Sequence, residues 1–140
     1  MTGFPQNPNY IGLNAPQGDE YAIDDLIVEG TIPADVDGTF FRAVPNPAYP
    51  PFMDDAGAVL SADGMLSAIR FNGGKASTQI RFVDTARHLA EKAAGQALFG
   101  KYRNPFTDKP DVQGVDRTVA NTTPVWHAGK LLMTKEDGRP

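Results

Sequence analysis

Two runs of β-forming residues on either side of an Asn-Gly-Gly sequence are the clearest pattern in the chain. The first run covers residues 65–71 and the second covers residues 78–83. Asn-Gly and Gly-Gly pairs supply the positive φ angles that a tight turn between antiparallel strands requires. The pattern therefore predicts a β-hairpin centred on residues 72–74.

Shorter patterns predict two strands before this hairpin. Within the partly alternating stretch 21–29, the apolar residues Ile23, Leu26 and Val28 are expected to face a core. Further along, an Asp-Gly turn signal introduces a short strand over residues 39–42. The chain is therefore rich in predicted strands from its first third onward.

A second strand pair is predicted near the end of the chain. Residues 122–127 and 131–136 are the two strands, and the Ala-Gly-Lys sequence at 128–130 is the turn between them. The second of these strands would have an unpaired outer edge, as expected of a fragment rather than of a completed sheet.

One helix is predicted directly after the first hairpin, where the apolar spacing changes from two to about 3.6. Thr85 is the expected N-cap, because its hydroxyl can accept a hydrogen bond from the first helical turn. Leu89, Ala93 and Ala97 lie on one face of this helix, and the helix is expected to end near Gly100.

Two segments are predicted to be loops. Residues 44–52 hold four prolines, which cannot donate hydrogen bonds to a sheet. Residues 101–114 are polar and interrupted by prolines, which is typical of a surface loop.

Composition agrees with a β-rich fold, because the 140 residues include 14 Gly and 12 Pro. We therefore assign the chain to the all-β class. Two hairpins separated by a helical insertion fit the blade-by-blade order of a β-propeller. Periodicity alone does not identify which propeller this is.

Charge and the N-terminal sequence exclude several classes of partner and location. The formal net charge of −4 gives no basic surface for a nucleic-acid backbone. The chain has no cysteine, so thiolate metal sites and disulfides are excluded. With no secretory signal and no apolar run near ~20 residues, we expect a cytoplasmic protein without a membrane span.

Three blocks of residues carry a resemblance to a known family. The first lies within residues 30–42 and contains Gly-Thr-Ile-Pro and Asp-Gly-Thr-Phe-Phe-Arg. The second, within residues 63–85, contains Asp-Gly-Met-Leu-Ser-Ala-Ile-Arg-Phe followed by Arg-Phe-Val-Asp-Thr. The third, within residues 120–136, contains Ala-Asn-Thr, Trp-His-Ala-Gly and Leu-Leu-Met-Thr-Lys-Glu. In order and spacing these blocks resemble the carotenoid cleavage oxygenases, the retinal pigment epithelial membrane protein family.

The resemblance implies a seven-bladed propeller with a non-haem iron held by four histidines. It divides the chain into an N-terminal arm, residues 1–25, and the N-terminal part of the propeller, residues 26–140, truncated at the C-terminus. Residues 94–105 and Lys135 further resemble the lignostilbene dioxygenase branch, which splits the central double bond of phenolic stilbenes with dioxygen.

By this resemblance, Tyr102 and Lys135 engage the 4-hydroxyl group of the substrate. A free phenol has a pKa near ~10, and an ammonium group beside it favours the phenolate. The resulting electron density would activate the alkene toward dioxygen. The structural alternative is a loop tyrosine and a solvated lysine at a strand end.

The resemblance also gives roles to Thr122 and Glu136. Thr122 corresponds to the small residue beside the open iron position, although a strand threonine is the simpler alternative. Glu136 corresponds to the carboxylate that orients an iron-bound histidine, against the alternative of a charged strand end. Strand alternation places Lys135 and Glu136 on opposite sides of one strand.

The two histidines of the chain do not suffice for the implied iron site. His88 is expected in the helix and His127 beside a turn, so we assign neither as a metal ligand. We expect Fe²⁺ in the full-length protein and neither iron binding nor turnover in this chain alone.

These observations favour a dioxygenase that cleaves a phenolic stilbene into two aldehydes, with dioxygen as the co-substrate. Cleavage of a carotenoid or apocarotenoid is the first alternative. A non-catalytic binding module derived from propeller blades is the second, and it would fold cooperatively by itself. A hydrolase is weakly supported because no Gly-x-Ser-x-Gly sequence occurs.

Overall fold

The computed structural model describes residues 3–136 and 138. It contains a four-stranded antiparallel sheet of order β1-β4-β3-β2 and a two-stranded sheet, β5-β6. The strands are β1 (Tyr21–Ile23), β2 (Gly38–Pro45), β3 (Gly64–Asn72), β4 (Lys75–Phe82), β5 (Pro124–His127) and β6 (Lys130–Met133). The helices are α1 (Ala86–Ala94) and the 3₁₀ turns η1 (Gly12–Asn14), η2 (Pro105–Thr107) and η3 (Pro110–Val112).

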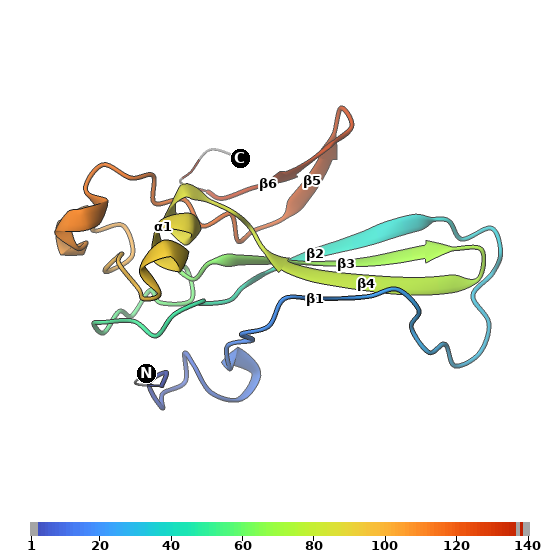
Figure 1. Cartoon of the computed structure of the whole chain (residues 1–140), viewed down its shortest axis with the longest axis horizontal. Coiled ribbons are helices and arrows are strands. Elements are labelled where there is room, and N and C mark those ends of the chain that lie inside the picture. The colour runs from blue at the N-terminus through green and yellow to red at the C-terminus, as the bar shows by residue number, and fades with distance from the viewer. Residues whose placement is uncertain (1–2, 137, 139–140) are drawn as a thin grey trace.

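The four-stranded sheet extends away from the region in which α1 and the irregular segments gather (Figure 1). The β5-β6 hairpin projects from that same region. None of the helices among the described residues is long and apolar enough to cross a membrane.

The central hairpin is confirmed, with β3 and β4 joined through Gly73 and Gly74. These glycines have φ angles of 56° and 77°. Two successive positive φ angles are the geometry of the tight hairpin turn, and glycine adopts them without steric cost.

The strands that flank this hairpin differ from the prediction. β1 covers only residues 21–23, and Ile23 and Val28 are exposed rather than core-facing. The predicted strand at 39–42 is present but longer, because β2 runs to Pro45 and so includes the start of the predicted loop. Proline is tolerated there because β2 lies at the edge of the sheet and Pro45 ends it.

The N-terminal arm is held to the body by Asn46. The Asn46 side chain accepts a hydrogen bond from Gln17 N at 2.8 Å and donates one to Gln17 O at 2.6 Å. Because β1 also pairs with β4, the predicted arm contributes to the sheet. The boundary between the arm and the propeller part, after residue 25, stays a prediction. Residues 1–2 of the arm and residues 137 and 139–140 of the propeller part lie outside the described residues.

Helix α1 begins as predicted and ends earlier. The Thr85 hydroxyl accepts a hydrogen bond from His88 N at 3.0 Å, which confirms the N-cap. The helix ends at Ala94 because Gly95 adopts the left-handed conformation, with φ of 65°. The predicted apolar face is wrong, since Leu89 is 48% exposed and Ala97 lies beyond the end of the helix. The buried helix residues are Arg87, His88 and Glu91.

The segment after α1 forms a small core instead of a plain surface loop. Leu98, Phe99 and Val112 pack together, so the prediction of a surface loop over residues 101–114 is wrong at Val112. The same segment also contains the 3₁₀ turns η2 and η3. A residue on a short 3₁₀ turn carries no periodic signal, which explains why the sequence does not reveal its burial.

The start of β3 lies against the segment that precedes β5. Gly64 N donates to Val119 O at 2.7 Å, and a Cβ on Gly64 would overlap the backbone of Ala120. Only glycine permits this approach.

The predicted final strand pair is confirmed with shorter strands. Thr122 precedes β5, and Lys135 and Glu136 follow β6. The prediction that Lys135 and Glu136 occupy opposite sides of a strand is therefore wrong, because Met133 is the last residue of β6 in the strand register.

Candidate functional site

Tyr102 and Lys135 lie next to each other although they are distant in sequence. The Lys135 Nζ atom is 5.4 Å from the centre of the Tyr102 ring. The Lys135 side chain is only 3% exposed, so its charge is largely removed from water. A cation over an aromatic face is stabilised electrostatically, and more so when desolvated.

Within the part of the chain that the structure describes, the ammonium group of Lys135 has two further polar partners. Its Nζ donates to Leu60 O at 2.9 Å and lies 3.3 Å from Glu136 Oε2. Because an ammonium has three N–H donors, these two contacts leave capacity for one ligand oxygen.

Tyr102 is fixed through its backbone. Its amide N donates to Asp55 Oδ2 at 2.8 Å. The Arg103 guanidinium carbon lies 5.1 Å from the centre of the Tyr102 ring, so two cationic side chains contact this aromatic group.

Both side chains line a cavity of about 190 Å³ that also reaches Leu60, Arg87 and Thr118. A cavity of ~150 Å³ is enough to enclose a benzene ring. The cavity, which opens to solvent, is therefore large enough to admit one ring of an aromatic ligand with a polar substituent at Lys135.

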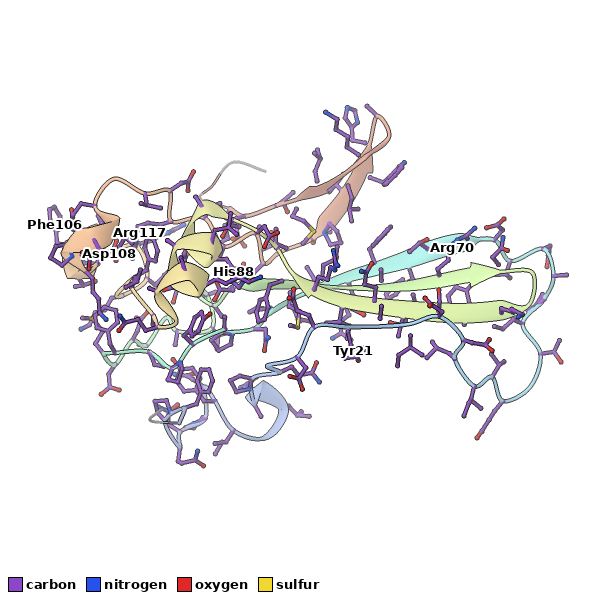
Figure 2. The ribbon with its side chains drawn as sticks, viewed as in Figure 1. Tyr21, Arg70, His88, Phe106, Asp108 and Arg117 are labelled. Atoms are coloured by element: carbon purple, nitrogen blue, oxygen red, sulfur yellow. The ribbon has the colours of Figure 1, made fainter. Side chains whose placement is uncertain are left out.

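Arg117 forms part of the cavity wall and is held by Asp108. Its Nε lies 2.9 Å from Asp108 Oδ2, and its Nη2 donates to Asp108 Oδ1 at 3.0 Å. Figure 2 shows Arg117 and Asp108 together, close to Phe106 and at the end of the molecule opposite Arg70. This two-point pair orients the wall and neutralises one of its charges.

A second polar cluster is buried beside α1. Arg87 Nε lies 3.7 Å from Glu91 Oε2 and 4.0 Å from Asp63 Oδ1, and His88 Nδ1 lies 3.8 Å from the same Asp63 oxygen. Burial raises the pKa of Glu91, and the nearby Arg87 charge opposes that rise. Glu91 Oε1 accepts hydrogen bonds from two backbone amides, at 2.8 and 3.2 Å, which partly satisfy the carboxylate.

Sequence reasoning did not identify Asp55 or this buried cluster as functional or structural centres. Arg87 and Glu91 are four residues apart, which is the spacing of neighbours on one helix face, so the pair was visible in the sequence. Its burial was not visible, because charged helix residues usually face solvent.

Thr122 is half-buried and its hydroxyl is engaged locally. It lies 2.7 Å from Thr134 O and 2.9 Å from Thr134 Oγ1. These contacts join the segments on either side of the β5-β6 hairpin. The predicted place of Thr122 beside an iron position stays a prediction.

Glu136 is 63% exposed at its side chain and contacts Lys135. Its predicted histidine partner is neither of the histidines in the chain. His88 is buried and stacks on Phe82 with the ring centres 4.8 Å apart, and His127 is exposed in β5.

The residues described do not fit an iron site. Among residues 3–136 and 138, no group of three or more His, Cys, Asp or Glu side chains is arranged to hold a metal ion. The polar groups that do converge, around Tyr102 and Lys135, suit an organic ligand with an acidic hydroxyl.

Comparison with known proteins extends over almost the whole chain. Residues 14–140 match the family model described as retinal pigment epithelial membrane protein. A resveratrol cleavage oxygenase of Chaetomium globosum is 47% identical over 139 residues, covering 99% of this chain and 23% of that protein. A lignostilbene-alpha,beta-dioxygenase of Sphingomonas paucimobilis is 46% identical over 138 residues, covering 98% of this chain and 28% of that protein. The chain thus spans about a quarter of the length of these relatives.

Solved structures show the same similarity. The lignostilbene dioxygenase of Pseudomonas brassicacearum superposes with a TM-score of 0.90 at 40% identity, covering 98% of this chain and 28% of that one. A variant of Synechocystis apocarotenoid oxygenase superposes with a TM-score of 0.68 at 28% identity over 89% of this chain. The predicted fold, antiparallel sheets of a partial propeller with one helical insertion, is confirmed. The chain belongs to the retinal pigment epithelial membrane protein family, that is, to the carotenoid cleavage oxygenases.

Proposed function

We propose that the full-length protein is a non-haem iron dioxygenase that cleaves the conjugated double bond of a phenolic stilbene into two aldehydes. The observation that carries this proposal is the buried Lys135 ammonium beside the Tyr102 ring, at the wall of a cavity of about 190 Å³. Relatives named for resveratrol and lignostilbene support the substrate class.

The role of this chain is to bind the phenol as its phenolate, after the hydroxyl proton has passed to solvent. A stilbene ring occupies the cavity, and its 4-hydroxyl oxygen meets Lys135 Nζ and the Tyr102 hydroxyl. A phenol has a pKa near ~10, and a positive charge in a water-poor site lowers it, because the charged form is then favoured. The phenolate donates electron density into the conjugated double bond.

Iron is proposed as the cofactor that supplies dioxygen activation, held by residues outside the described part of this chain. The predicted roles of Thr122 and Glu136 belong with that centre. Glu136 has a present role as well, since its carboxylate lies 3.3 Å from Lys135 Nζ and lowers the cost of burying that charge.

Cleavage of an apocarotenoid is the second candidate, supported by the structural similarity to the Synechocystis enzyme. A polyene without a hydroxyl group would make no use of a buried ammonium. The two candidates therefore differ in whether activity depends on Lys135.

The test compares full-length variants on a 4-hydroxystilbene, its 4-methoxy analogue and an apocarotenoid. Lys135→Met should lower kcat/KM for the 4-hydroxystilbene about 100-fold and Tyr102→Phe about 10-fold, the range expected for losing a charged and a neutral hydrogen bond. Lys130→Met, at an exposed lysine in β6, is the matched control and should leave kcat/KM unchanged. Full activity in both site variants would refute the proposal.

A further inference from the structure

We propose that residues 55–60 form a positioning turn that sets the placement of Tyr102 relative to Lys135. Asp55 is its central positioning residue. The inference rests on the proposed function, because it concerns how the two phenol-binding side chains reach their places.

The Asp55 carboxylate bonds to both segments at once. Its Oδ1 accepts a hydrogen bond from Gly57 N at 2.9 Å, which closes the turn. Its Oδ2 accepts one from Tyr102 N at 2.8 Å. Hydrogen bonds from backbone N–H groups to a carboxylate are stronger than those to neutral acceptors, so one side chain joins the turn firmly to the Tyr102 backbone.

Gly57 provides the surface on which Tyr102 rests. A Cβ added to Gly57 would lie 2.7 Å from the Tyr102 Cβ, closer than two such atoms approach. The hydrogen bond from the Tyr102 amide to Asp55 fixes the backbone of Tyr102. The contact with Gly57 fixes the Cβ atom of its side chain.

The same turn continues to the residue that holds Lys135. Leu60 N donates to Gly57 O at 2.9 Å, and Leu60 O accepts from Lys135 Nζ at 2.9 Å. The buried Asn121 side chain secures this end, since its Nδ2 lies 3.3 Å from Leu60 O. One short turn therefore contacts both side chains that bind the phenol.

Replacing Asp55 disturbs the geometry without removing either phenol-binding group. In Asn an NH₂ group replaces one of the two carboxylate oxygens, so one of the two backbone donors, Gly57 N or Tyr102 N, faces another donor and loses its hydrogen bond. The expected result for Asp55→Asn in the full-length protein is a roughly 10-fold loss of kcat/KM for the 4-hydroxystilbene. We expect the loss mainly in KM, with little change for the 4-methoxy analogue.

The decisive experiment is a double-mutant cycle of Asp55→Asn and Tyr102→Phe. If Asp55 acts through Tyr102, the double variant should have the same kcat/KM for the 4-hydroxystilbene as Tyr102→Phe alone, because the effects of coupled residues do not add. Additive losses would overturn the inference. Asp54→Asn, at the exposed neighbouring aspartate, is the matched control and should leave both constants unchanged.

A spectroscopic measurement separates positioning from loss of folding. Bound anaerobically, a 4-hydroxystilbene absorbs at longer wavelength as the phenolate than as the phenol, and Asp55→Asn should reduce the phenolate fraction. An unchanged fraction in folded Asp55→Asn overturns the inference. If that variant does not fold, Asp55→Glu enters the same cycle, and additivity with Tyr102→Phe is again the overturning result.

The outcomes also separate this inference from the proposed function. If Lys135→Met and Tyr102→Phe keep full activity, the proposed function fails. If they lose activity while Asp55→Asn does not, only the positioning turn is wrong.

Discussion

The four-stranded sheet and the irregular region around α1 use different interactions. In the sheet, backbone hydrogen bonds are regular, β1 is exposed throughout and β2 is exposed or half-buried. The irregular region holds the core of Leu98, Phe99 and Val112. Burial is therefore low along the two edge strands of the sheet, and it is concentrated around α1 and at the start of β3.

The two regions also treat charge differently. On the sheet, Asp37 and Arg70 form an ion pair in which both side chains are well exposed to solvent. Beside α1, Arg87, Glu91 and Asp63 are buried together. Exposed pairs contribute little to stability, whereas removing one member of a buried group leaves a charge without compensation. The comparison predicts that equal chemical changes have unequal effects.

The largest effect is expected at the junction of the two regions. Met65 is the second residue of β3 and is 1% exposed, whereas Phe40 in β2 is 58% exposed. Met65→Ala should lower the free energy of unfolding by about 2–5 kcal/mol through lost burial and the cavity left behind. Phe40→Ala should cost under ~1 kcal/mol. Urea denaturation of the full-length variants measures both, and similar losses would show that burial does not distinguish the regions.

A pH-dependent effect is expected inside the buried cluster. Because burial raises the pKa of Glu91 above its usual 4.5, the folded state holds this proton more tightly than the unfolded state. The stability that the protonated side chain contributes is complete below pH 4.5 and is lost as pH rises through the folded-state pKa. The amide of Glu91→Gln cannot ionise, so this variant does not lose stability at position 91 as pH rises.

The stability of Glu91→Gln relative to the parent protein should therefore increase as pH rises through the folded-state pKa of Glu91. Thermal denaturation at a series of pH values measures the difference. Glu29→Gln, at an exposed glutamate, is the control and should show a constant difference. A constant difference for Glu91→Gln as well would contradict the raised pKa.

The same contrast explains what the sequence could predict. The β3-β4 hairpin and the Thr85 cap are local features, since turn glycines and a capping hydroxyl act within a few residues. The buried face of α1 was missed because Arg87 is buried by partners distant in sequence, including Asp63 and the ring of Phe99, which lies 5.1 Å from the guanidinium carbon.

The candidate site was predictable only in part. Family resemblance indicated Tyr102 and Lys135, and the structure brings them together. Asp55 was missed, because an Asp-Asp-Ala-Gly sequence indicates a turn but not which distant backbone amide its carboxylate binds. Side-chain bonds between irregular segments have no period along the sequence, so no pattern could have placed them.

The smallest effect is expected for the exposed ion pair on the sheet. Hydrogen bonds from Arg70 and Asn72 lower the pKa of Asp37, so its contribution to stability is present above the unfolded-state pKa and is lost as pH falls through the folded-state pKa. Solvent screens this pair. Asp37→Asn should therefore lower stability at neutral pH, measured as the shift of the urea midpoint, by less than Met65→Ala or Glu91→Gln changes it. Raising the salt concentration should shrink even that difference. A loss as large as that of Met65→Ala, insensitive to salt, would show that the end of the hairpin depends on charge as strongly as the region around α1 does.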